Sequence, residues 1–134
     1  MISKKEISSF QKNGYLIKKT NDLKSLNNIQ DFIYKILSKD KKNVPKDKIK
    51  YFETLHSFIK KKELNNFRVS AITNVNKNKK FREYYYNSAK EILDGLVGNE
   101  IAMQKKINLS IQIPNDNKSM LPMHSDIYAG ESPF

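Results

Sequence analysis

The sequence contains no cysteine, and only two of its 25 basic residues, Arg68 and Arg82, are arginines. The absence of cysteine excludes disulfides, zinc–thiolate sites and thiol nucleophiles. The scarcity of arginine weakens a nucleic-acid interpretation of the net charge of +11, because the planar arginine fork is the side chain that best reads bases and phosphates. After Asp94 three lysines stand against four acidic residues, so the basic excess lies earlier in the chain. We therefore expect mainly solvated lysines and no nucleic-acid partner.

Long apolar runs are also missing from the sequence. No stretch approaches the length that a helix needs to cross a bilayer. Lys4 and Lys5 stand close to the N-terminus, and no apolar region of a signal peptide follows them. We therefore expect a cytoplasmic protein with no membrane span.

The apolar residues that are present recur every three or four positions through the first 98 residues, which is typical of amphipathic helices. Ser3 and Glu6 have the spacing of a capping box, and Gly14 marks the end of the first helix. Further helices are predicted from Asn21 or Asp22 to about Ser38, from Asp47 through Ile59, from Glu63 to Val75, and from Lys79 to Leu96. With one early strand at 15–18, these helices form the expected N-terminal part, residues 1–98.

The pattern changes from residue 99 onward. Isoleucine or leucine alternates with a polar residue over 107–113, and this period of two predicts a strand, as does the apolar content of 100–106. The order of elements therefore indicates an α+β fold, in which a helical layer leads into an incomplete sheet. Residues 99–134 are expected to supply the first strands of this one, incomplete domain.

His124 and Asp126 are the candidate metal ligands. Two residues that are two positions apart on an extended segment point to the same side, so an imidazole and a carboxylate here face one metal ion. These are two of the three ligands of the 2-His-1-carboxylate site of Fe(II) oxygenases. The alternative is a surface histidine beside an aspartate in a turn. His56, the other histidine, is expected to be partly buried on a helix and not to be a ligand.

The segment from Asn108 to Asp126 resembles the phytanoyl-CoA dioxygenase-like family of Fe(II)/2-oxoglutarate oxygenases. More narrowly, it is similar to bacterial members found among genes for surface-carbohydrate biosynthesis. The stretch 10–17, in which an Asn-Gly turn leads into an apolar run, resembles the opening of that family. The resemblance implies a double-stranded β-helix of the jelly-roll or cupin type, preceded by a helical layer.

The resemblance also implies a set of ligands. His124 and Asp126 would bind Fe(II), which together with 2-oxoglutarate and O₂ would act on a small-molecule or carbohydrate-linked substrate. Asn108, Ser110 and Gln112 are candidates to contact 2-oxoglutarate, and the alternative, that they face solvent or another layer, stays open. The distal histidine and the basic partner of 2-oxoglutarate would follow residue 134, so we expect an N-terminal portion that is inactive alone.

Two other classes of function remain open from the sequence. One is a cupin-like or helical binding module without redox chemistry, in which His124 has no metal role. The other is a basic protein that binds anionic surfaces. A second histidine and a basic residue encoded beyond residue 134 would favour the oxygenase over both.

Overall fold

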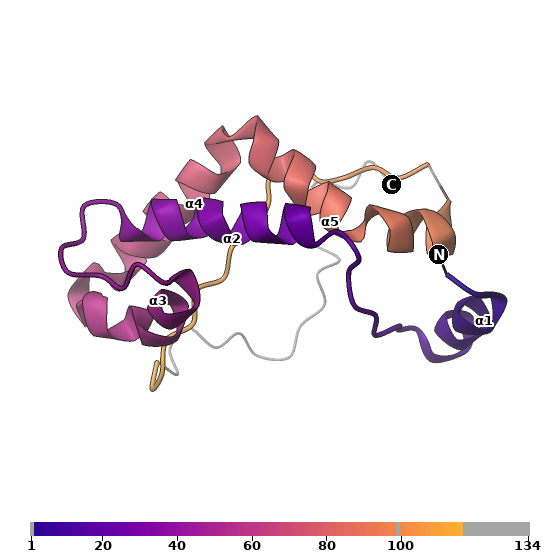
Figure 1. The fold of residues 1–134 in the computed structure, drawn as a ribbon, viewed down its shortest axis with the longest axis horizontal. Coiled ribbons are helices and arrows are strands. Elements are labelled where there is room, and N and C mark those ends of the chain that lie inside the picture. The colour runs from indigo at the N-terminus through magenta and orange to yellow at the C-terminus, as the bar shows by residue number, and fades with distance from the viewer. Residues whose placement is uncertain (1, 99, 117–134) are drawn as a thin grey trace.

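The computed structural model describes residues 2–98 and 100–116, and the regular elements in these ranges are all helices (Figure 1). The α-helices and 3-10 helices are α1 (Lys4–Asn13), α2 (Leu23–Ser38), α3 (Lys48–Thr54), η1 (Leu55–Phe58), η2 (Lys61–Glu63), α4 (Leu64–Lys77) and α5 (Lys79–Val97). Side chains of Ser3, Asp22, Asp47 and Asn78 accept hydrogen bonds from backbone N–H groups in the first turns of α1, α2, α3 and α5. The prediction of successive amphipathic helices is therefore confirmed.

The third helix is shorter than its sequence pattern predicts. The apolar spacing indicates a helix through Ile59, but α3 ends at Thr54 and the chain continues as η1. The Thr54 hydroxyl donates to the carbonyl of Lys50 at 2.7 Å, a bond from residue i to i−4 that competes with the backbone pattern of the helix. His56 lies in η1 and is exposed, so the prediction that it is partly buried on a longer helix is wrong.

Helix α2 lies at the centre of the structure and packs against α5, α4 and α3 (Figure 1). Two clusters of buried apolar residues hold this layer together. The first includes Leu37, Tyr51, Leu55, Ile59, Leu64, Ala71 and Ile111. The second includes Val75, Phe81 and Ile107, with Phe32 of α2 stacked in a tilted geometry on Phe81 at 5.2 Å between ring centroids. The layer is thus built by the apolar stripes that the sequence predicts.

Helix α1 stands apart from this layer and contains no buried residue (Figure 1). The non-helical stretch 14–22 joins it to α2, and Ile17 in this stretch is 89% exposed. The contact with the helical layer comes from Ile2, because a Cβ added to Gly95 of α5 would lie 2.8 Å from Ile2 Cγ1. The small residue in α5 therefore allows the N-terminal residues to approach the helix.

Residues 101–113 form a non-helical segment that crosses the helical layer without a strand partner among the described residues. Ile107 is buried in one apolar cluster and Ile111 in the other. Leu109 packs against both clusters from a half-buried position. The alternating pattern thus places one apolar face on the helices, as a strand on a sheet would.

The predicted α+β fold with an incomplete jelly-roll or cupin-like β-helix is wrong for residues 2–98 and 100–116, where no strand or sheet forms. Strands at 15–18, 100–106 and 107–113 are likewise absent. A period of two specifies which side chains face a core, but a strand also needs a neighbouring backbone that completes its hydrogen bonds. The described residues provide helices and side chains in that place.

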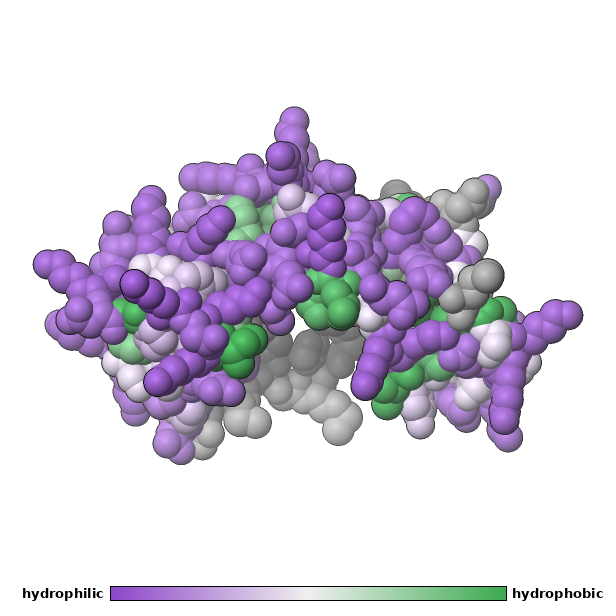
Figure 2. Space-filling view, viewed as in Figure 1, coloured by the Kyte–Doolittle hydropathy of each residue, from purple (hydrophilic) through white to green (hydrophobic). Residues whose placement is uncertain are grey.

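The surface of the helical layer is dominated by hydrophilic residues, and most of the described lysines are exposed (Figure 2). Within residues 2–98 and 100–116, no helix has both the length and the apolar character that crossing a membrane requires.

Candidate functional site

The polar row of residues 108, 110 and 112 lies on the exposed face of the extended segment. Asn108, Ser110 and Gln112 are all exposed, whereas Ile107 and Ile111 between them are buried against the helices. The Gln112 Nε2 donates to the Ser110 Oγ at 3.0 Å, which links two members of the row. The segment therefore packs its isoleucine face on the helical layer and turns its amide and hydroxyl groups outward.

The predicted metal ligands His124 and Asp126 lie outside the residues that the structure describes. Among residues 2–98 and 100–116, no group of three or more His, Cys, Asp or Glu side chains comes close enough to hold a metal ion. An imidazole and a carboxylate are ligands that suit Fe(II), so the two residues fit part of the donor set of such a site. A third ligand is not identified within the described ranges.

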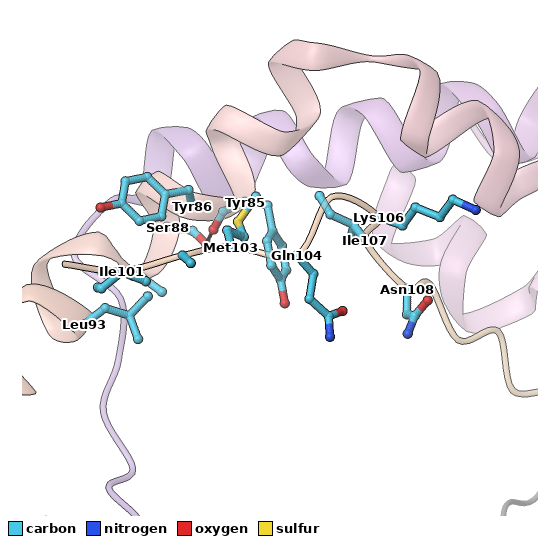
Figure 3. Close-up of a pocket in the computed structure, with 12 residues that line it drawn as sticks. Tyr85, Tyr86, Ser88, Leu93, Ile101, Met103, Gln104, Lys106, Ile107 and Asn108 are labelled. Carbon is cyan, nitrogen blue, oxygen red and sulfur yellow. Dashed lines mark hydrogen bonds between the residues drawn. The ribbon is translucent and has the colours of Figure 1, made fainter. Parts of the chain in front are cut away.

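A cavity of about 570 Å³ lies between α5 and residues 101–108 (Figure 3). Helix α5 contributes Tyr85, Tyr86 and Leu93 to the lining. The extended segment contributes Ile101, Met103, Gln104 and Asn108, among others. This volume lies in the range of small-molecule sites, which is about 300–1,000 Å³. Asn108 thus belongs both to the predicted cosubstrate-binding row and to the largest of the described cavities.

The cavity combines an apolar wall with a polar opening. Leu93, Ile101 and Met103 form apolar lining, while the Tyr85 hydroxyl and the Gln104 and Asn108 amides point to the same side (Figure 3). Lys106 is the charged lining residue, and its ammonium group points away from these polar groups (Figure 3). Such a lining suits an uncharged ring-bearing or apolar molecule with hydrogen-bonding groups at one end.

The extended segment is held by three side chains that the sequence analysis did not select. Arg68, Asn76 and Arg82 come from α4 and α5, and each binds backbone atoms of residues 103–111. The signal that would have found two of them was present, because a chain with 25 basic residues uses arginine only at these two positions. Arginine offers several N–H donors in a fixed plane, which lysine cannot replace at carbonyl groups.

The buried tyrosine of the first apolar cluster has a structural role. Tyr51 has no exposed surface, and its hydroxyl donates to the carbonyl of Leu37 at 2.7 Å. Burial, followed by the nearby Tyr34, raises the pKa of Tyr51 to about 12. The hydroxyl therefore stays protonated and serves as a hydrogen-bond donor, remote from the segment's polar row.

No family model, curated protein or solved structure matches this chain. Its functional assignment therefore depends on its own residues and their arrangement.

Proposed function

We propose that this chain forms the N-terminal portion of an Fe(II)/2-oxoglutarate-dependent oxygenase that acts on a small or carbohydrate-linked molecule. The observation that carries the proposal is the pair His124 and Asp126, which follows the extended segment at the spacing of two metal ligands. The resemblance of 108–126 to phytanoyl-CoA dioxygenase-like proteins supports the same reaction class. The helical layer does not contradict this reaction, because activity depends on a site and not on a fold.

The residues have distinct roles in this proposal. Bound Fe(II), 2-oxoglutarate and O₂ would supply the oxidative chemistry. His124 would donate a neutral imidazole nitrogen and Asp126 a carboxylate oxygen, which also offsets part of the metal's charge. Asn108, Ser110 and Gln112 offer amide and hydroxyl groups that can donate to the oxygens of 2-oxoglutarate.

The arrangement of the described residues supports this division of roles. The segment turns its polar row outward and keeps its isoleucines on the helices, so the row is available to a ligand. Asn108 lines the cavity beside α5, where a substrate ring would find the apolar wall of Leu93, Ile101 and Met103. A cosubstrate on the row and a substrate in the cavity would therefore be neighbours.

Binding of Fe(II) to the purified chain, measured by anaerobic calorimetry, tests the proposal directly. We expect weak binding that His124→Ala or Asp126→Ala reduces at least about tenfold, as expected for the loss of a ligand. His56→Ala is the matched control, because it removes the other histidine and should leave the affinity unchanged. Equal affinities of wild type and Asp126→Ala would reject a carboxylate-containing iron site.

Turnover provides the second measurement. The chain alone is expected not to convert 2-oxoglutarate, whereas a version that continues into a second histidine and a basic residue should form succinate with Fe(II) and ascorbate present. His124→Ala and Asp126→Ala in that longer version should abolish succinate formation, and His56→Ala should not. Undiminished turnover in Asp126→Ala would contradict the proposed ligand set.

A helical binding module is the second candidate function, and the cavity beside α5 is the observation that favours it. Anilinonaphthalene sulfonate, which fluoresces in apolar sites, is a suitable probe. A module of this kind predicts saturable probe binding that Ala89→Trp abolishes by filling the cavity, with an unchanged melting temperature. Probe binding without any Fe(II) binding would favour the module over the oxygenase.

A further inference from the structure

Both arginines of the chain bind the backbone of the same extended segment. Arg82 donates from Nη2 to the carbonyl of Met103 at 2.7 Å and from Nη1 to that of Lys105 at 2.5 Å. Arg68 donates from Nε to the carbonyl of Ile111 at 2.9 Å and from Nη2 to Asp116 Oδ2 at 3.0 Å. The side chain of Arg68 is 21% exposed and that of Asp116 is 17% exposed, so this end of the segment is shielded from solvent. The two arginines thus hold the segment at both ends.

Asn76 of α4 holds the middle of the segment through two hydrogen bonds to one residue. The Ile107 N–H donates to Asn76 Oδ1 at 2.8 Å, and Asn76 Nδ2 donates to the Ile107 carbonyl at 2.9 Å. The same Nδ2 also donates to the carbonyl of Ile72 at 2.9 Å, which fixes the amide on its helix. An exchange of both bonds with a single residue is how opposite residues pair in an antiparallel ladder. The Asn76 side chain therefore takes the place of one residue of a neighbouring strand.

All the carbonyls that these side chains hold belong to odd-numbered residues, namely 103, 105, 107 and 111. In an extended chain alternate residues direct their backbone groups to the same edge and their side chains to the same face. A shift by one residue would present the wrong edge and would bury Asn108 in place of Ile107. A shift by two would place Lys105 or Leu109 where Asn76 and the second apolar cluster now hold Ile107. The contacts thus select one register.

We propose that Arg68, Asn76 and Arg82 are positioning residues, which fix the register of 103–113 and thereby the polar row and the metal ligands that follow it. The metal part of this inference rests on the proposed oxygenase function. The three side chains do for one edge of the segment what a neighbouring strand does in a sheet. The isoleucines alone cannot do this, because apolar contacts are not directional.

Asn76→Ala tests the inference, with Asn74→Ala as its matched control. Both asparagines lie on α4, both are exposed, and both donate to a carbonyl four residues earlier, but only Asn76 reaches the extended segment. The first readout is the hydrogen-exchange rate of the Ile107 amide, measured by NMR. We expect Asn76→Ala to raise it at least about tenfold, since the amide loses its acceptor, and Asn74→Ala to leave it unchanged. Asn76→Asp keeps an acceptor for this amide and should restore much of the protection.

The second readout is Fe(II) affinity, which a merely local stabilising role would not change. We expect Asn76→Ala and Arg82→Gln to weaken binding several-fold at an unchanged melting temperature, with Arg82→Lys intermediate. If wild type binds Fe(II) and Asn76→Ala matches Asn74→Ala in affinity, positioning of the metal ligands is overturned while the oxygenase proposal stands. If wild type binds no Fe(II) through His124 and Asp126, the oxygenase proposal fails, and the exchange rates alone decide whether Asn76 fixes the register. Equal Ile107 exchange in both alanine variants overturns the register itself.

Discussion

The helical layer and the extended segment use the same isoleucines and leucines but are held in different ways. Helices α2 to α5 satisfy their own backbone hydrogen bonds, so apolar contacts are enough to assemble them. The segment 101–113 has no backbone ladder among the described residues and depends on side chains of α4 and α5 for its carbonyl partners. Burial of one face is common to both regions, whereas self-sufficiency of the backbone belongs to the helices alone.

Truncation of Tyr51 to alanine should have the largest effect on stability, because it lies at the centre of the helical layer. The ring is fully buried and contacts Tyr34 edge to face at 5.2 Å between centroids, and its hydroxyl binds the Leu37 carbonyl. We expect a loss of about 3–5 kcal/mol in the free energy of unfolding, measured by urea denaturation. Tyr85→Ala, at a half-exposed position, should cost less than about 1 kcal/mol. Similar losses at both positions would mean that the layer has no packed centre at Tyr51.

Ile111→Ala asks whether the extended segment belongs to the same core. Ile111 is 7% exposed and lies in the cluster that contains Tyr51. We expect its truncation to cost about 2–4 kcal/mol in urea denaturation, less than Tyr51→Ala. Ile17→Ala is the control, since that side chain is 89% exposed and should change stability by less than about 0.5 kcal/mol. A loss at Ile111 no larger than at Ile17 would show that the segment is not packed on the layer.

The sequence predicted the helical layer well because each helix carries its own signals. Asp22 and Asn78 cap helices at the positions where they occur in the structure, and the apolar stripes face the core. For the extended segment the period of two correctly predicted which residues are buried, Ile107 and Ile111, but not what would pair with the backbone. Hydrogen-bond partners that are distant in sequence leave no periodic signal, so the strands were predicted where side chains such as Asn76 serve instead.

The candidate site was predictable in part. The outward direction of Asn108, Ser110 and Gln112 follows from the same period of two, once the isoleucines face the helices. The cavity beside α5 was not predicted, because it arises where two segments meet and no local pattern reports it. The metal pair His124 and Asp126 lies outside the described residues and stays a prediction from the sequence.

Hydrogen exchange compares the two regions without any substitution. Amides of residues 23–38 in α2 should exchange at least about tenfold more slowly than those of 108–113, because helix bonds open only with the packed layer. Within the segment, the Ile107 amide should be the slowest, since it has an acceptor on Asn76 at 2.8 Å. Equal protection of 108–113 and α2 in the monomer would indicate that the segment has backbone partners of its own.

Helix α1 offers the smallest effect and sets the lower limit of the comparison, because it is a helix without a buried residue. Its capping box depends on ionised Glu6, which accepts from the Ser3 N–H and Oγ at 2.8 Å each and from Lys18 Nζ at 2.9 Å. The Ser3 backbone bond, followed by the bond from Lys18 and that from the Ser3 hydroxyl, lowers the pKa of Glu6 to about 2. A depressed carboxyl pKa stabilises the folded form at every pH above the ordinary carboxyl range.

This stabilisation should be lost as the pH falls through about 2, where the folded form of Glu6 takes up its proton. We therefore expect the amides of residues 4–9 to lose protection on acidification before those of α2, as monitored by NMR. Glu6→Gln is the matched control, because glutamine retains an acceptor for the capping box but has no proton to gain. The difference between α1 and α2 should then no longer change with pH. A wild-type α1 that stays as protected as α2 down to pH 2, or a Glu6→Gln variant that titrates like wild type, would show that contacts other than this cap hold the helix.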